Sequence, residues 1–191
     1  CPTDESRDHT VKIDVSGLSS GATYYYRFRA LDRASATGRT RTTPVGDVER
    51  VRMAVASCSR YSSGYFHAYR GIAARDDLDV VLHLGDYIYE YQSNGRDGER
   101  AHLPDREIVT LDDYRARYAQ YRSDPDLQEA HRRHPWVVVW DDHESANNGW
   151  RDGAQNHQPD EGSWVERRLN AERAYSEWLP MRDQADGRIF R

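Results

Sequence analysis

Three short apolar stretches of the chain end in side chains that can bind metal ions or move protons. The stretches, each with its chemically active ending, are 51–58 with Cys58, 80–86 with Asp86, and 135–144 with Asp142 and His143. Thiolates, carboxylates and imidazoles are the usual protein ligands of metal ions. One such ending would carry little weight, but three endings at one edge of one sheet would form a site.

The first two stretches favour a redox-capable or strongly Lewis-acidic metal over magnesium alone. The two oxygens of the Asp86 carboxylate can bridge two cations. Tyr89 can reach the same place if the chain turns after Asp86, and its phenolate is a hard anionic ligand for a ferric-type ion. Cys58 supplies a thiolate, which is a strong ligand for a transition metal.

The third stretch favours a second cation and an acid–base group. Asp142 can hold a harder cation through oxygen, and His143 can donate a hydrogen bond to a phosphoryl oxygen or a proton to a leaving group. Two metal ions about 3.5–4 Å apart, with an activated water, make a site for the hydrolysis of phosphoesters.

Each of these residues also has a structural interpretation. Cys58 could be a small buried hydrophobic residue, and Tyr89 could be a core residue like most of the 13 tyrosines. The carboxylates at 141–142 could cap a helix, and His143 could be a surface histidine. Their shared position at strand ends favours the functional interpretation.

The stretches themselves predict strands of an α/β domain with a largely parallel sheet. The run from Val80 is rich in β-branched and long aliphatic residues, which predicts a strand buried on both faces. From Val51 onwards such runs alternate with helical patterns. The predicted helices are 64–75, 111–122, 125–133 after the Asp124 cap, and 164–179 after the Ser163 capping box. Their aromatic residues are expected in the core rather than at a ligand.

Residues 1–46 differ in pattern from the rest of the chain. Their alternating and β-prone runs predict strands at 10–16, 22–30 and 39–44. They resemble the last strands of a fibronectin type III or immunoglobulin-like sandwich, with a tyrosine-corner position near Tyr24. That sandwich needs about seven strands, so we expect its front to be missing from the chain. A free-standing three-stranded sheet is the alternative.

Composition and charge argue against two classes of protein. The chain has 27 Lys and Arg against 32 Asp and Glu, and its arginines are scattered among acidic residues, which argues against specific nucleic-acid binding. No apolar run reaches 18 residues, so no transmembrane segment is expected. No signal peptide is recognisable and residue 1 is Cys rather than Met, which indicates a processed or excised piece.

Three motifs together resemble the PhoD family of alkaline phosphatases and phosphodiesterases. They are Ala56-Ser57-Cys58, Leu84-Gly85-Asp86-Tyr87-Ile88-Tyr89-Glu90, and Trp140-Asp141-Asp142-His143-Glu144 followed by Asn147-Asn148. The calcineurin-like metallophosphoesterases are more distant relatives, and their Gly-Asn-His-Asp/Glu motif aligns with 141–144. The amino-terminal strands are also similar to the immunoglobulin-like module of that family. The resemblance covers nearly the whole chain and implies a layered metallophosphatase-type sheet with flanking helices.

The resemblance also implies what each residue does. The implied roles are Cys58, Asp86 and Tyr89 as ligands of a ferric ion, Asp142 as a ligand of calcium, and His143 as the catalytic histidine. Asn148 is a candidate contact either of the substrate or of a residue that binds the metal. Arg60 follows Cys58 closely and is a candidate contact of a phosphate oxygen, with a solvated surface arginine as the alternative. Asp86 would be shared between the two cations. The implied substrates are phosphate monoesters or diesters, and the complete protein would be extracytoplasmic and monomeric.

The end of the chain, at 187–191, departs from this pattern. The chain stops where such proteins enter a further strand, and the remaining metal ligands of the family lie beyond it. We therefore expect 47–191 to be the amino-terminal half of a catalytic domain, and the chain to be a fragment without normal activity. Two alternatives stay open: a zinc- or manganese-dependent phosphoesterase of the wider superfamily, and a non-catalytic binding module.

The polar segment 92–107 is either a substrate lid or rim, or a flexible surface insertion.

Overall fold

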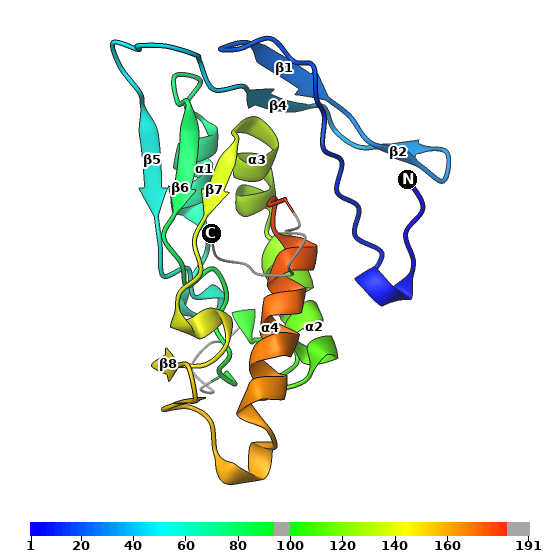
Figure 1. Ribbon diagram of the computed structural model, residues 1–191, viewed down its shortest axis with the longest axis vertical. Coiled ribbons are helices and arrows are strands. Elements are labelled where there is room, and N and C mark those ends of the chain that lie inside the picture. Colours follow the sequence, from blue (N-terminus) through cyan, green and yellow to red (C-terminus); the bar gives the residue numbers. More distant parts are fainter. Residues whose placement is uncertain (94–99, 183–191) are drawn as a thin grey trace.

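Figure 1 shows a computed structural model of the protein, which describes residues 1–93 and 100–182. Strands and helices alternate in its larger part, and small antiparallel sheets form the amino-terminal part. The predicted lid or insertion at 92–107 lies partly outside the described residues, and 187–191 lies wholly outside them. In the described part of the chain, no helix is long and apolar enough to cross a membrane.

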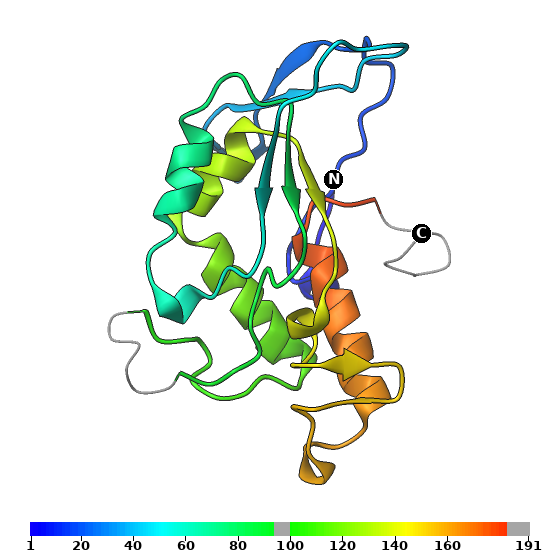
Figure 2. The ribbon, with the colours of Figure 1, turned by 90° about the vertical axis from the view of Figure 1, so that its left-hand side faces the viewer.

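The centre of the larger part is a parallel sheet of three strands. β5 (Met53–Ala56), β6 (Val80–His83) and β7 (Trp136–Val138) pair in chain order, with β6 in the middle. Both pairings are parallel, so the carboxyl ends of all three strands meet at the same edge, as Figure 2 shows. The predicted parallel strands at the three apolar stretches are confirmed.

Four α-helices lie in the described residues and connect or cover the strands. Their bounds are α1 (His67–Ala73), α2 (Leu111–Arg122), α3 (Pro125–Arg133) and α4 (Trp164–Trp178). Thr110 closes a capping box before α2, and the Asp124 side chain accepts from two backbone N–H groups of α3. The Ser163 side chain caps α4 by accepting from one backbone N–H group, that of Glu166. The predicted bounds of α2 and α3 are confirmed. α1 covers 7 of the 12 residues predicted at 64–75, and α4 ends one residue earlier than predicted.

The core between the sheet and the helices is largely aromatic. Tyr114, Tyr118 and Tyr121 of α2 are buried together with Tyr175 of α4 and Val81 of β6. α1 packs against α3, and α2 packs against α4. Burial of large aromatic surfaces supplies most of the driving force for such a core. The expected core role is confirmed for these aromatic residues and is wrong for Tyr65, which is 59% exposed.

The opposite face of the sheet is exposed. The side chains of Met53, Val55 and Val137 are 55%, 59% and 52% exposed. Leu82 of β6 lies between Val55 and Val137 in register and is half-buried, whereas Val81 on the helix side is fully buried. The prediction that β6 is buried on both faces is wrong for the described residues, because no second layer covers this face within them.

The amino-terminal part forms two small sheets. Its strands are β1 (Thr23–Tyr26) paired with β4 (Gly38–Arg41), and β2 (Arg29–Ala30) paired with β3 (Arg33–Ala34), all antiparallel. The predicted strand at 10–16 is wrong: its apolar side chains Val11, Ile13 and Val15 are exposed, and no strand within 1–93 or 100–182 pairs with it. The sandwich stays a prediction, although the Tyr24 hydroxyl accepts from Ser19 N at 2.8 Å, as in a tyrosine corner.

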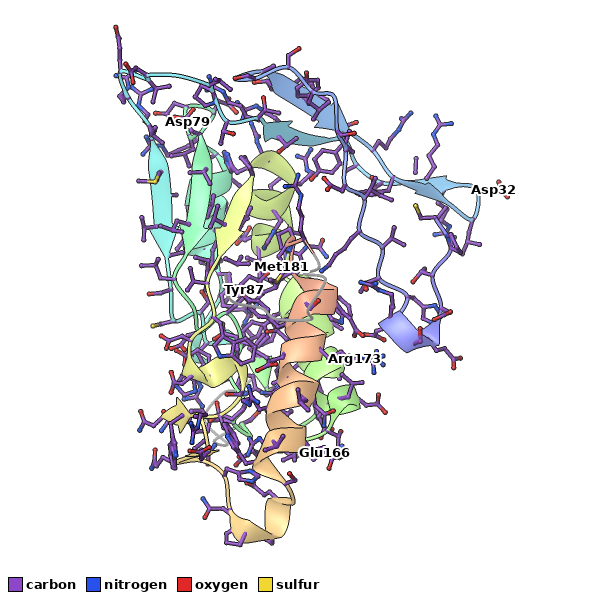
Figure 3. The ribbon with its side chains drawn as sticks, viewed as in Figure 1. Asp32, Asp79, Tyr87, Glu166, Arg173 and Met181 are labelled. Atoms are coloured by element: carbon purple, nitrogen blue, oxygen red, sulfur yellow. The ribbon has the colours of Figure 1, made fainter. Side chains whose placement is uncertain are left out.

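Side chains link the amino-terminal part to the larger part. Arg41 of β4 pairs with Asp79, which lies at the amino end of β6 in Figure 3, at 2.6 Å. A second link joins the amino-terminal segment to the end of α4, where the indole N–H of Trp178 donates to Asp8 at 3.0 Å. The predicted division of the chain after residue 46 stays a prediction.

Candidate metal centre

Backbone hydrogen bonds hold the turns after β5 and β6 side by side. Cys58 N donates to the Gly85 carbonyl at 3.2 Å, and Ser59 N donates to the Asp86 carbonyl at 3.0 Å. The predicted thiol and the predicted shared carboxylate therefore lie at the same edge of the sheet. The structural alternative for Cys58, a small buried hydrophobe, is wrong, because this residue is exposed.

Three predicted site residues have left-handed backbone conformations. The φ angle is 56° at Cys58, 54° at Asp86 and 51° at Asn148. This conformation costs a non-glycine residue about 1–2 kcal/mol, and it is concentrated at functional sites. Gly85 has a φ of 105°, and a Cβ at this position would lie only 2.3 Å from Cβ of Asp141. Glycine therefore allows the turns after β6 and β7 to approach each other.

The Asp86 carboxylate is buried and only partly hydrogen-bonded. The Tyr89 hydroxyl donates to Oδ2 of Asp86 at 3.0 Å. Burial raises the pKa of Tyr89, and the nearby Asp86 and Cys58 raise it further. The other carboxylate oxygen, Oδ1, has no hydrogen-bond partner among the described residues. A buried charged oxygen in this state loses its hydration without compensation, so it is suited to bind a cation.

Asp142 and His143, in the turn that follows β7, complete the cluster. Both lie in the 3-10 helix η4 (Asp142–Glu144), which follows β7. Ligand atoms of Asp86, Asp142 and His143 all lie within 4.8 Å of one another. Cys58 is not one of these three, but its thiol neighbours the hydroxyl of Tyr89. The structure thus brings the five predicted metal and catalytic residues together, and their individual roles stay predictions.

Glu90 orients the His143 imidazole. Nδ1 of His143 lies 2.7 Å from Oε2 of Glu90, which is fully buried. Burial acts to lower the pKa of His143, but the hydrogen bond to Glu90 and the charges of Asp86 and Asp142 outweigh it and raise this pKa. The ring also packs on Tyr89, with 4.2 Å between the ring centroids. Neighbours on two sides therefore fix this imidazole.

The two predicted substrate contacts, Arg60 and Asn148, contact the cluster in different ways. The Arg60 guanidinium is 5.5 Å from the ring centroid of Tyr91, and that ring lies 5.3 Å from the His143 ring. The side chain of Asn148 donates to a neighbouring glutamine at 3.2 Å, while its backbone N–H donates to Asp142. Asn148 therefore contacts the site through its backbone N–H, and Arg60 contacts it through the ring of Tyr91.

Two buried glutamates at the site were given no role from the sequence. Glu90 accepts from Asn147 N at 2.7 Å and from the Asn156 side chain at 2.8 Å, besides its contact with His143. Burial raises the pKa of Glu144 to about 8, although three backbone N–H groups act to lower it. A carboxylate enclosed by tyrosines at 89–91 is the signal that could have identified Glu90.

The chain is similar to known phosphatases along nearly its whole length. It matches the families described as "PhoD-like phosphatase" over residues 53–191 and "PhoD-like phosphatase, N-terminal domain" over residues 1–44. It is 44% identical to alkaline phosphatase D of Bacillus subtilis (strain 168), across 91% of this chain and 30% of that protein. A solved structure described as "Structure of PhoD" matches with a TM-score of 0.87 and 41% identity, across 96% of this chain and 36% of that one. The chain therefore spans about a third of the length of these relatives.

Proposed function

Since the chain belongs to the PhoD-like phosphatase family, we propose that it is part of a metal-dependent enzyme that hydrolyses phosphate monoesters or diesters. The observation that carries this proposal is the buried Asp86 oxygen without a hydrogen-bond partner, clustered with Asp142 and His143. An anionic cluster of this kind stabilises bound cations, and bound cations supply the positive charge that an acidic site needs to bind a phosphate.

The side chains at the site fit iron and calcium. Cys58 and Tyr89 offer a thiolate and a phenolate, which favour a ferric ion, and Asp142 offers a carboxylate oxygen, which favours calcium. Asp86 lies between both sets and would be shared. When bound, such cations supply positive charge to the phosphoryl oxygens and lower the pKa of a coordinated water.

His143, Arg60 and Asn148 would bind the substrate or hold the residues that do. His143, held by Glu90, would donate a hydrogen bond to a phosphoryl oxygen or a proton to the leaving oxygen. Arg60 would bind a phosphate oxygen through its guanidinium. Asn148 would keep Asp142 in place through its backbone N–H and could also contact the substrate.

Elemental analysis of the full-length protein, combined with hydrolysis of a nitrophenyl phosphate monoester and diester, tests this function. We expect iron and calcium in the purified protein, and turnover of at least one ester. Zinc or manganese in their place would favour a phosphoesterase of the wider superfamily. The absence of both metal and turnover would favour a non-catalytic binding module.

The thiol ligand has its own test. Cys58→Ala in the full-length protein is expected to lose the bound iron, because one anionic ligand is removed. Its activity is expected to be at least 100-fold lower than that of the parent. Cys1→Ala is the matched control, since Cys1 is also a free, exposed thiol. Unchanged iron content in Cys58→Ala would remove this residue from the site.

An extracytoplasmic location and a monomeric state for the complete protein are further parts of the proposal. They rest on the family to which the chain belongs. Cell fractionation and sedimentation of the full-length protein test them.

A further inference from the structure

The backbone ladder between β6 and β7 ends before the turns that carry the site. Its last hydrogen bond runs from Val139 N to the His83 carbonyl at 2.9 Å. Among the described residues, no backbone hydrogen bond joins 84–90 to 140–144. Something other than the sheet must therefore set the separation between these two turns.

The Glu144 carboxylate bridges this gap. Its Oε1 accepts from Tyr87 N at 2.6 Å, and its Oε2 accepts from Asp86 N at 3.2 Å and from Asp141 N at 2.9 Å. The side chain is fully buried. Figure 3 shows Tyr87 beyond the arrowheads of the strands, in the region where the two turns meet. One carboxylate thus holds the backbone of both turns, one after β6 and one after β7.

A carboxylate is the side-chain group that this position requires. Two oxygens with about four lone pairs can accept three N–H groups, and in the ionised form the charge strengthens each bond. The amide of a glutamine has the same shape but one acceptor oxygen, so its NH₂ group would face a backbone N–H. The carboxylate of an aspartate keeps the charge but is one methylene shorter. The two substitutions therefore separate hydrogen-bonding capacity and reach from charge.

We propose that Glu144 is a positioning residue, which sets the separation of the Asp86 and Asp142 carboxylates and thereby the cation affinity of the site. The inference rests on the proposed function, because it takes both aspartates as cation ligands. Glu144 acts through the backbone N–H groups of Asp86 and of Asp141, the residue before Asp142. A group that acted through its negative charge alone would be replaced by aspartate without loss.

Calcium titration of the full-length, metal-free protein tests this inference. Glu144→Gln and Glu144→Asp are both expected to bind Ca²⁺ at least tenfold more weakly than the parent, measured by calorimetry. Hydrogen exchange at the amides of Asp86, Tyr87 and Asp141 is expected to be at least tenfold faster in both variants. Glu177→Gln is the matched control, because Glu177 is also buried and hydrogen-bonded but pairs with Arg115 between α4 and α2. It should keep parental calcium affinity and parental exchange at these amides.

Four results would overturn the positioning role. Unchanged exchange at the three amides would show that Glu144 does not hold the turns. Faster exchange with parental calcium affinity would show that their separation does not matter. Parental affinity in Glu144→Asp would assign the effect to charge. A parent that binds no calcium would refute the proposed metal site itself and the inference with it, which separates this failure from the other three.

Discussion

Asp86 combines three costly features in one residue. Its backbone is left-handed with a φ of 54°, its side chain is only 7% exposed, and its Oδ1 has no hydrogen-bond partner among the described residues. The unpaired oxygen alone costs about 1–3 kcal/mol in the metal-free protein. Residues of this kind persist where function requires them, so Asp86 is expected to lower stability while it serves the site.

Asp86→Asn is expected to raise the free energy of unfolding of the metal-free protein by about 1 kcal/mol, because it removes a buried charge. Asparagine tolerates the left-handed backbone and keeps an acceptor for Tyr89. Urea denaturation with chelator measures the change. Asp112→Asn, whose parent side chain is 94% exposed, is the control and should change stability by less than about 0.5 kcal/mol. A lower stability of Asp86→Asn would contradict the interpretation.

His83 makes stability depend on pH. Burial lowers the pKa of His83 to about 4 in the folded protein, against about 6.5 in the unfolded chain. Above pH 6.5 the residue is neutral in both states. As the pH falls from 6.5 to 4, the unfolded chain binds the proton first, so the free energy of unfolding falls.

His83→Phe should lose this pH dependence. Between pH 7 and pH 5, the parent is expected to lose about 2 kcal/mol more stability than the variant, measured by urea denaturation at both pH values. His9→Phe is a control, because His9 is exposed, and it should follow the parent. Equal losses in the parent and His83→Phe would show that His83 does not supply the dependence.

At the scale of elements, the start of α3 couples a local cap to a buried ion pair. The Asp124 side chain accepts from Asp126 N at 2.9 Å and from Leu127 N at 3.0 Å. Its other oxygen pairs with Arg100 at 2.9 Å, and both of these side chains are buried. The Arg100 guanidinium also lies 3.7 Å from the ring centroid of Tyr61. One carboxylate therefore starts a helix and anchors an arginine from a distant loop.

Asp124→Ala is expected to lower the free energy of unfolding by about 3–5 kcal/mol, because the cap is lost and a buried Arg100 charge is left unpaired. Chemical denaturation measures the loss. Ser163→Ala removes the cap of α4 at an exposed position and serves as the comparison, with an expected loss of about 1 kcal/mol. Equal losses in both variants would show that the Arg100 pair contributes nothing beyond the cap.

At the scale of the whole molecule, the uncovered sheet face is the main departure from a closed α/β fold. Val55 of β5 and Val137 of β7 flank Leu82 and are more than half exposed. Contiguous apolar surface of this kind binds hydrophobic partners or dyes. The face is thus the part of the described molecule with the greatest tendency to associate.

The double substitution Val55→Thr with Val137→Thr is expected to reduce binding of a hydrophobic fluorescent dye by this chain at least twofold. Stability should change by less than about 1 kcal/mol, because both side chains are largely exposed. Dye fluorescence and thermal unfolding measure the two effects. Val81→Thr, on the buried face of β6, should instead destabilise the protein without reducing dye binding. Unchanged dye binding in the double variant would show that this face is not the binding surface.

Helices with local end signals were the most predictable elements. α3 has its predicted bounds, because the Asp124 cap acts on backbone groups two or three residues away. α2 also has its predicted bounds, and the Thr110 capping box that fixes its start was not predicted. The alternating pattern at 10–16 failed as a strand signal, because alternation needs a partner strand and a core face, and the described part of the chain places neither beside this segment. The convergence of Cys58, Asp86 and the Asp142–His143 pair was predictable from the parallel arrangement of the strands.

The sequence by itself determined which side chains stand at the ends of the three strands, since chain order and the apolar runs are local properties. Only the tertiary structure decided that Glu144 reaches the backbone N–H of Asp86, 58 residues away, and that Glu90 holds His143. It also decided which face of the sheet is covered. The physical reason is that such contacts depend on how the packed strands and helices place distant segments, and no pattern within a few residues encodes that distance.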